Sequence, residues 1–530
     1  MSGITLSSSV RQNLLSLQST ADLLSTTQNR LATGKKVNTA LDNPTNYFTA
    51  SSLDARASDI NNLLDGIGNG VQILQAANTG ITSLQKLVDS AKSVANQALQ
   101  TQVGYSTKST VSVAIAGATA SNLLGTPTNA QVTGTVVNND NTGAAAPITA
   151  ATQLVGTAGA ASNDLGTAIT AGSVLTVNGK TLTFSATGTT ETNDGNGNYT
   201  FGMAATSTLK VGDVLSAIDS ITGASGASAS SIAGGKISLS TGTTSDLTIS
   251  GTNNVLTALG LTAGTTARTT ALGGKTLAIQ ATGGGTATNI TFGTGANQVS
   301  TLNGLNTALA SNNLQASLDS SGNLSITTTN DAASSTIGAL TGSTGPFAGL
   351  TVAAPVADAT AQGTRSSLVS QYNNIINQIT TTAQDASFNG VNLLGGDTLK
   401  LVFNETGKST LSISGVNFNP TGLGLANLTS GTDFIDNAST NKVLTSLNNA
   451  STTLRSQASA FGSNLSIVQI RQDFSKNLIN VLQTGSSNLT LADTNEEAAN
   501  SQALSTRQSI AVSALSLANQ SQQSVLQLLR

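Results

Sequence analysis

The stretch RLATGKKVNTALDNP, residues 30–44, interrupts an orderly helical repeat and decides how the chain is organised. Before it, residues from Val10 onward recur at steps of three and four, the spacing of a coiled-coil seam. Gly34 suits the position just after a helix end, and Asn43-Pro44 suits a new helix start. The stretch therefore predicts a helix stop, a link and a second helix, and so two helical layers on one chain.

The composition of the 530-residue chain argues against most catalytic functions. There is no His and no Cys, which removes the usual general base, the commonest metal ligand, Ser-His triads and thiolate chemistry. Only 9% of residues are charged and the net charge is −3, so nucleic acid is not an expected partner. We expect no enzyme, no cofactor and no metal site.

No segment of the sequence predicts membrane insertion or a cleaved signal. The first thirty residues lack a basic region followed by a continuous apolar stretch, and no run is apolar for about 18 residues. We expect no membrane partner. These features fit either a cytosolic protein or one that is exported without a cleaved signal peptide.

Helical repeats occupy both ends of the chain. A long run covers residues 60–98, a shorter one covers 368–379, and another covers 447–468. After a break expected at Gly485, a capping box at 494–497 opens a last helix. The seam positions that we expect to pack helix against helix are Leu14, Leu17, Leu24, Leu31, Leu74, Ile81, Leu84, Val88, Leu504, Ala511, Val525 and Leu528.

The outer faces of these predicted helices carry few charges, which suggests helices packed by others on several sides. An ordinary long helix bundle is the alternative that the pattern leaves open.

The middle of the chain, residues 105–363, has a different pattern. Short alternating runs separated by Gly and Asn predict strands, and a degenerate repeat relates residues 171–262 to residues 272–350. A further hairpin is expected at 398–415. Low-complexity disorder is the competing interpretation, which the regular alternation disfavours.

Motifs for phosphate and calcium are incomplete. Gly-Lys-Ser/Thr occurs at 179–181, 274–276 and 407–409, but the earlier glycine of a phosphate loop is missing each time, so hairpin turns are expected. DGNGN at 194–198 lacks the later Gly and Glu of a calcium loop.

Five linked motifs resemble bacterial flagellins. They are RLATGKKVNTALDNP with Arg30, Leu31, Gly34, Asn38, Ala40 and Asp42, DGIGNGVQILQAANTGITSLQKL at 65–87, DASFNGVNLL at 385–394, NLTLADTNEEAA at 488–499, and ANQSQQSVLQLLR at 518–530. Arg30, Gly34, Asn38 and Asp42 match the family's connector between its two helical layers. The resemblance covers about residues 1–104 and 364–530.

The resemblance implies an α+β multidomain fold with antiparallel terminal helices in coiled-coil or bundle layers and a β-rich outer domain inserted between them. The inner layer is expected from residues 1–42 and 491–530, and the helical wall from 43–104 and 364–490 with the hairpin. Residues 105–363 would form the surface-exposed outer region. The seam positions above would then form the coiled-coil and polymerisation interface.

The resemblance also implies a function: an extracellular subunit of the helical flagellar filament, used for motility. Such a subunit is exported unfolded by the flagellar type III route, and its termini fold on assembly. The expected partners are further copies of the chain, the export apparatus and a chaperone, the filament cap and the hook-junction proteins, with O-glycans possible on the outer domain. The Ala-rich faces of the terminal helices are too weak to make these helices stable alone, and ordering them is costly, so packing must supply the stability, which agrees with folding on assembly.

Two features depart from the family pattern. The large insertion precedes the 368–379 run and the hairpin, whereas the commoner layout places it after the hairpin. In the segment resembling the family's innate-receptor site, Lys86, Val88 and Asp89 replace an Arg-rich stretch, with Val88 where a key Arg is expected. We therefore expect weak recognition by that receptor.

Two alternatives remain beside the filament subunit. A hook–filament junction protein would share the terminal helices, and a β-repeat adhesin or phage-tail protein would explain the middle alone. The paired helical termini disfavour the adhesin.

Overall fold

The computed structural model describes residues 7–280, 282, 286–340 and 343–528, with side chains described as far as residue 524. The chain divides into two compact units. The helical unit is drawn from residues 1–97, 368–429 and 442–530, and the β-rich unit from 98–367 and 430–441. The fold is thus terminal helices with a β-rich insertion between them.

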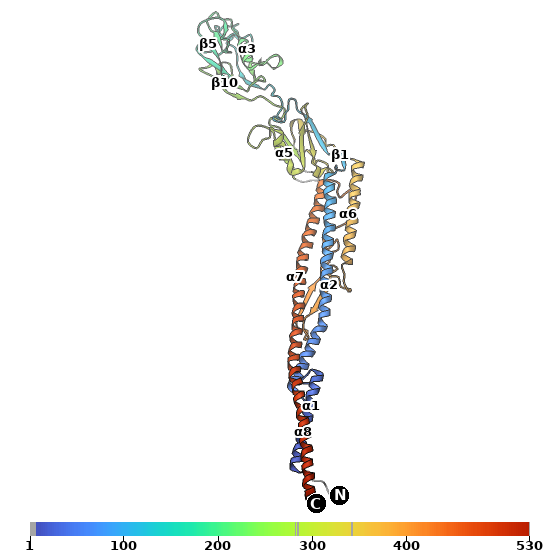
Figure 1. Ribbon diagram of the computed structural model, residues 1–530. Coiled ribbons are helices and arrows are strands. Elements are labelled where there is room, and N and C mark those ends of the chain that lie inside the picture. The colour runs from blue at the N-terminus through green and yellow to red at the C-terminus, as the bar shows by residue number, and fades with distance from the viewer. Residues whose placement is uncertain (1–6, 281, 283–285, 341–342, 529–530) are drawn as a thin grey trace. The chain divides into compact units, whose positions relative to one another are not determined.

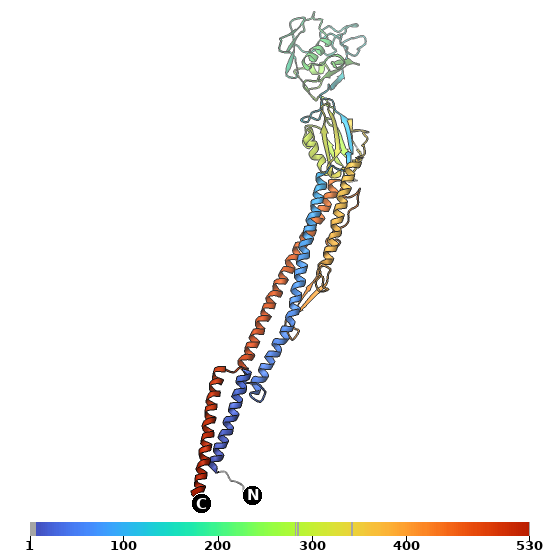
Figure 2. The ribbon, with the colours of Figure 1, turned by 45° about the vertical axis from the view of Figure 1, so that its right-hand side comes forward.

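Two terminal helices run side by side and antiparallel in the helical unit (Figures 1 and 2). They are α1 (Ser8–Thr33) and α8 (Thr494–Leu528). Gln522 Nε2 donates a hydrogen bond to Ser7 Oγ at one end of the pair, 2.5 Å away. Arg30 and Glu497 meet at the other end. These contacts fix the direction of the pair.

Long helices form the rest of the helical unit. They are α2 (Pro44–Gln100), α6 (Ala359–Asp385) and α7 (Asn437–Thr490), and α2 runs alongside both others in the views of Figures 1 and 2. Asn43 caps α2 by accepting a hydrogen bond from the Asn46 backbone N–H at 3.0 Å, and Pro44 takes the first helical position. This is the helix start that the sequence predicts.

A β-hairpin packs against α2 where glycines allow a close approach. Strands β17 (Thr398–Val402) and β18 (Thr410–Ser414) pair antiparallel, with Leu399 opposite Ile413. A Cβ added at Gly70 would lie 2.5 Å from Leu401 Cδ2. The glycine therefore lets the hairpin sit directly on the helix backbone.

The sequence prediction of a helix break at Gly485 is wrong. Helix α7 continues through Gly485 to Thr490 without interruption. A single glycine costs about 1 kcal/mol relative to Ala in a helix, which the packing of a 54-residue helix overrides. The chain reverses only after Thr490.

Besides the ends of α2, α6 and α7, the described residues of the β-rich unit form short strands and three α-helices. Its strands are β1 (Tyr105–Thr107), β2 (Thr110–Ala114), β3 (Gln131–Val136), β4 (Val174–Val177), β5 (Lys180–Ser185), β6 (Glu191–Asn193), β7 (Tyr199–Gly202), β8 (Ser231–Ala233), β9 (Lys236–Ser240), β10 (Leu247–Gly251), β11 (Gly264–Thr266), β12 (Thr276–Ile279), β13 (Thr288–Thr291), β14 (Leu314–Leu318), β15 (Asn323–Thr328) and β16 (Val356–Ala357). Its helices are α3 (Val211–Thr222), α4 (Val255–Ala258) and α5 (Leu302–Leu309), with 3-10 turns at Gly226–Ser228, Ala310–Asn312, Asn330–Ala332 and Gly345–Phe347.

Among the described residues, the largest sheet has six strands in the order β11-β10-β4-β5-β7-β6. Its β5–β7 pair is parallel and the other pairs are antiparallel. Two three-stranded sheets follow the orders β14-β15-β2 and β3-β9-β8, and two-stranded pairs join β12 with β13 and β1 with β16. The alternating burial of β4 and β5 explains their alternating sequences.

Two hydrophobic clusters fill the β-rich unit. One draws on residues from Ile148 to Leu261, and the other on residues 111–124 and 272–347. Each contains a stacked phenylalanine pair, Phe184–Phe201 in the first and Phe292–Phe347 in the second. The strand pairing differs, because β5 meets β7 in parallel while β12 meets β13 antiparallel. The internal duplication therefore stays a prediction.

Candidate assembly surfaces

The α1–α8 pair buries a polar seam. Along α1 the buried side chains include Val10, Thr20 and Thr27, and Leu17 and Leu24 are half-buried between them. Thr20 turns its hydroxyl back to the Ser16 carbonyl at 2.8 Å, so its polar group needs no partner from α8. The pair is held by small and half-covered side chains rather than by a continuous apolar core.

The predicted seam of α1 is only partly covered. Leu14 is 36% exposed and Leu31 is 39% exposed, because the contact with α8 follows the line through Thr20 and Thr27. Leu15 and Leu23 are more exposed still. Helix α1 therefore presents leucines that remain partly uncovered by the described part of the chain.

Helix α8, like α1, has one line of half-buried residues and further apolar residues that are exposed. Half-buried residues recur at heptad spacing at Ser501, Leu504, Gln508, Ala511, Leu515 and Ala518. Leu504 and Ala511 thus lie on this line. Val525 and Leu528, also predicted seam residues, lie outside the residues whose side chains are described. Ile510, Val512 and Leu517 stay exposed.

The connector between α1 and α2 is organised by Asp42. Its Oδ2 accepts hydrogen bonds from the backbone N–H groups of Asn38 and Thr39, at 2.9 and 2.7 Å. The Asn38 side chain donates to the Lys35 carbonyl at 3.1 Å, and Gly34 takes the left-handed conformation that ends α1. The backbone hydrogen bonds from Thr39 and Asn38 lower the pKa of Asp42 below its ordinary value.

The two connectors of the chain lie against each other. Lys36 N–H donates to the Thr490 carbonyl at 2.7 Å, and Ala492 N–H donates to the Gly34 carbonyl at 3.0 Å. Val37 is buried beside them. The connector between α1 and α2 is therefore tied by backbone hydrogen bonds to the end of α7 and to the link that precedes α8.

The capping box predicted at 494–497 is wrong. Asp493 caps α8 instead, because its Oδ1 accepts from the backbone N–H groups of Asn495 and Glu496 at 2.9 and 3.3 Å. Glu497 is buried and pairs with Arg30, whose Nη1 lies 3.3 Å from its Oε1. Arg30 Nε is buried and has no hydrogen-bond partner among the described residues. Glu497, which the sequence pattern places in the helix cap, therefore forms a tertiary ion pair instead.

The seam of α2 is completely covered within the subunit. Leu74, Ile81, Leu84 and Val88 are all 0% exposed. These four residues therefore pack the subunit's own helices together. Lys86 and Asp89, from the segment that resembles the receptor site, are exposed, so Val88 is the one residue of that set hidden from a binding partner.

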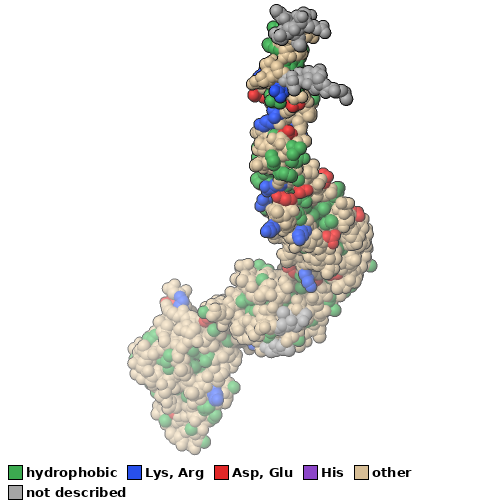
Figure 3. Space-filling model, turned by 90° about the horizontal axis from the view of Figure 1, so that it is seen from below, with side chains coloured by type: hydrophobic (Ala, Val, Ile, Leu, Met, Phe, Trp, Pro, Cys, Tyr) green, Lys and Arg blue, Asp and Glu red, His purple; other side chains and the backbone are tan. Residues whose placement is uncertain are grey.

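Helix α7 carries an exposed apolar stripe, which consists of Ile467, Ile470, Phe474 and Val481. These side chains follow one another at steps of three, four and seven, so they share one side of the helix. Ile470, Phe474 and Val481 are each more than half exposed. Figure 3 shows hydrophobic side chains at the surface and few charged ones over much of the face drawn. Exposed apolar stripes of this kind mark interaction surfaces.

No sequence pattern singles out Arg365, which is one of the largest buried side chains of the β-rich unit. Arg365 is 1% exposed and donates to the carbonyl groups of Ala98, Thr101, Gln102 and Phe434. Burial lowers its pKa, and the Asp436 carboxylate opposes that shift. The guanidinium thus ties the end of α2 to the segment before α7.

Family models match both ends of the chain. The bacterial flagellin N-terminal helical region matches residues 5–124, and the bacterial flagellin C-terminal helical region matches residues 444–529. The chain belongs to the bacterial flagellins. The N-terminal match in this flagellin contains α1, the connector and α2, and the C-terminal match contains α8 with most of α7.

Relatives of this flagellin include flagellins FljM and FljK of Caulobacter vibrioides. They are 33% and 32% identical over 167 residues, which is 31% of this chain and 60% of each relative. Flagellin A of Rhizobium meliloti is 36% identical over 88 residues, which is 17% of this chain and 22% of the relative. The chain thus spans about 60% of the length of the Caulobacter relatives.

The middle of this flagellin matches a different family, described as a domain of unknown function (DUF1522), over residues 125–295. That match crosses from the first hydrophobic cluster into strands of the second. Across the described residues, no helix combines the length and the apolar character that crossing a membrane requires.

Proposed function

We propose that this flagellin is a structural subunit that polymerises into the helical filament of the bacterial flagellum and has no enzymatic role. The observation that carries the proposal is the exposed apolar surface of the terminal helices: the stripe on α7 and the uncovered leucines of α1 and α8. A second copy of the chain is the occupant that the heptad spacing favours, because helices of like pattern pack against each other.

The surface on α7 and the surface on α1 and α8 differ, so the contact between copies is heterologous. A heterologous contact that does not close generates an open helical polymer rather than a ring. Burial of one large apolar side chain contributes about 1.5–3 kcal/mol, so several per contact suffice for a stable polymer. The filament lies outside the cell, and the chain reaches it unfolded through the flagellar type III export route.

The finer parts of the proposal follow from family membership. The export apparatus, a chaperone, the filament cap and the hook-junction proteins are its further partners, and O-glycans on exposed Ser and Thr of the β-rich unit are an added modification. An intact mass equal to 52.8 kDa for the native protein would refute the glycans. Weak activation of the innate receptor follows from the coverage of Val88, and strong activation at low nanomolar doses would contradict it.

Assembly in vitro tests the proposal. Purified chain is mixed with short filament seeds, and products are followed by sedimentation and negative-stain microscopy. The doubly substituted Ile470→Ser, Phe474→Ser chain should stay monomeric, because both side chains are exposed in the subunit and their loss leaves its fold intact. Lys476→Ser, an exposed substitution about 200° around the helix from Phe474, is the matched control and should polymerise.

The outcomes separate the alternatives. Long tubes from the parent chain support the filament subunit. Short caps on existing filaments, with no elongation, would favour a hook–filament junction protein. Monomers that neither elongate nor cap filaments would favour the remaining alternative, a β-repeat adhesin.

A further inference from the structure

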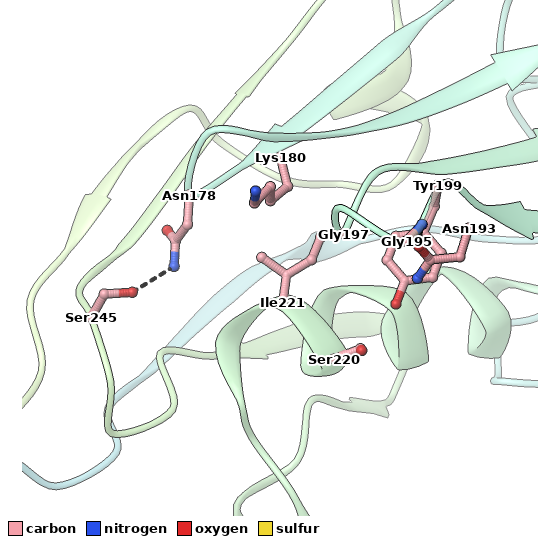
Figure 4. A pocket seen from close by; sticks show the side chains of 9 residues that line it. All are labelled: Asn178, Lys180, Asn193, Gly195, Gly197, Tyr199, Ser220, Ile221 and Ser245. Atoms are coloured by element: carbon pink, nitrogen blue, oxygen red, sulfur yellow. Dashed lines mark hydrogen bonds between the residues drawn. The ribbon is translucent and has the colours of Figure 1, made fainter.

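A cavity of about 620 Å³ lies at one end of the six-stranded sheet, in the β-rich unit, where no helix–helix contact uses it. Its polar lining consists of Asn178, Lys180, Asn193, Tyr199, Ser220 and Ser245 (Figure 4). The ends of β4 and β5, the strand ends that flank the β6–β7 loop, the last turn of α3 and the β9–β10 connection supply these residues. Sites for small molecules commonly measure about 300–1,000 Å³, so the cavity is large enough for a ligand.

Tyr199 provides the first sign of a ligand. Only 7% of the residue is exposed, and its hydroxyl has no hydrogen bond to another described residue; the hydroxyl is not among their buried unpaired atoms, so it is accessible. Figure 4 shows the hydroxyl end of the ring turned toward the side where Ser220 lies. The ring of Tyr199 is therefore buried, while its hydroxyl opens into the cavity and can bond to a ligand there.

Lys180 provides the second sign. Its ammonium group forms no ion pair with another described residue. The nearby carboxylates are engaged elsewhere: Asp194 accepts hydrogen bonds from Asn196 and Asn198 within its own turn, and Asp246 pairs with Arg268 at 3.1 Å. The Asp194 carboxylate still interacts with Lys180 through its charge, but no ion pair among the described residues occupies the ammonium group, which can therefore contact an anion in the cavity.

The remaining groups favour a ligand with several hydroxyls over a compact phosphate. Asn193 uses its Oδ1 to accept from Gly195 N–H at 2.8 Å, which leaves its amide N–H groups to donate. Ser220 belongs to the last turn of α3, so the helix end at this cavity carries partial negative charge and does not attract a dianion. Lys180 lies with Asn178 on one side in Figure 4, apart from Tyr199 and Ser220.

We propose that this cavity binds an acidic saccharide, a uronate, with its carboxylate at Lys180 and its ring hydroxyls at Tyr199, Ser220 and Asn193. A uronate carries one negative charge and several groups that both donate and accept hydrogen bonds, which matches this separation of one ammonium from neutral polar groups. The inference concerns the outer region of the chain and goes beyond the role in assembly, on which it does not depend.

Binding of sodium galacturonate to the full chain tests the proposal, by calorimetry and by saturation-transfer NMR of the sugar. Galacturonate should bind, and galactose should bind about tenfold more weakly, because it lacks the charge-assisted contact. Lys180→Gln should remove that difference. Tyr199→Phe and Ser220→Ala should each weaken the binding of galacturonate by about fivefold. Lys236→Gln, an exposed lysine on β9, is the control and should bind like the parent.

Three results would overturn the proposal. One is the absence of galacturonate binding at tens of millimolar. Another is equal binding by the Lys180→Gln and parent chains. A third is displacement of galacturonate by equimolar acetate, which would reduce the site to a simple anion contact. Circular dichroism of each variant establishes folding, and Ser220→Ala, at an exposed position, keeps the test valid if Tyr199→Phe does not fold.

Discussion

Along α2, Leu74, Ile81 and Leu84 are completely covered, whereas along α1 Leu14 and Leu31 keep 36% and 39% of their surface exposed. Both helices follow the same three- and four-residue spacing. Helix α2 fills its seam with large apolar side chains against neighbours in its own subunit, and α1 packs threonines against α8. The spacing of apolar residues therefore predicts that a helix packs against another helix. The exposed fraction of those residues shows whether the packing is complete within the same chain.

The energetic consequence of this difference is large. A fully buried leucine contributes about 1.5–3 kcal/mol, and a leucine that is more than a third exposed contributes less than that. Helix α2 belongs to the stable part of the subunit. The α1–α8 pair has a short list of buried side chains, so in the proposed filament it would gain most by burial against another copy.

Truncation of a leucine in each helix should give the largest contrast. Leu84→Ala should lower the free energy of unfolding of the monomer by about 2–5 kcal/mol, because it leaves a cavity in a fully covered seam. Urea denaturation followed by helical circular dichroism measures the loss. Leu31→Ala should change monomer stability by less than about 1 kcal/mol yet raise the concentration needed for polymerisation. Equal losses of unfolding free energy in the Leu84→Ala and Leu31→Ala chains would contradict the distinction between α2 and α1.

Replacement of two glycines of α2 by Ala should change the stability of the subunit in opposite directions. A Cβ at Gly80 would lie 2.6 Å from Ala386 Cβ and 2.7 Å from Leu394 Cδ1, so Gly80→Ala should destabilise the subunit by about 1–3 kcal/mol. A Cβ at Gly66 would meet nothing within 4 Å, so Gly66→Ala should stabilise the helix by about 0.5–1 kcal/mol. Thermal denaturation compares the two, and a shared sign would refute the close packing at Gly80.

The Arg30–Glu497 pair should stabilise the α1–α8 pair to a smaller extent. Glu497→Gln should weaken it by about 1 kcal/mol, since the ion pair becomes a neutral hydrogen bond and Arg30 is partly exposed. Hydrogen exchange of the monomer, read on peptides of α1, should become about fivefold faster. Glu496→Gln removes an exposed carboxylate from the same helical turn, and its exchange should match the parent.

The smallest effect is the acid response of the connector. Backbone hydrogen bonds lower the pKa of Asp42 in the folded chain, so its contribution is present above the unfolded pKa and is lost as pH falls through the lower folded value. Exchange of the connector amides in the parent and in Asp42→Asn, compared at equal pH, should differ at pH 7 and converge as the pH falls through the folded pKa of Asp42. A difference that did not shrink on acidification would exclude Asp42 as the cause.

The sequence could predict the elements that depend on local signals. Gly34 and Asn43-Pro44 bound their helices through their own backbone preferences, and the buried seam of α2 follows from spacing alone. The connector residues Arg30, Gly34, Asn38 and Asp42 were found through their resemblance to the family and do gather at one end of the α1–α8 pair.

Tertiary contacts account for what the sequence could not predict. Glu497 matches a cap pattern but pairs with Arg30. Helix α7 continues through Gly485 because its packing outweighs the helix-breaking tendency of the glycine. Arg365 sits in an unremarkable polar stretch, and its carbonyl partners come from positions up to 267 residues away. The parallel β5–β7 pair has no signature in alternation, because parallel and antiparallel strands alternate alike in a sheet with one face covered.

Hydrogen exchange of α1 and α8 peptides, in monomer and in filament, tests the central claim most directly. The account predicts that residues 8–33 and 494–524 exchange faster than residues 60–95 of α2 in the monomer, and that the three become similarly protected in the filament. Protection of α1 and α8 equal to that of α2 in the monomer, with no change on assembly, would contradict it.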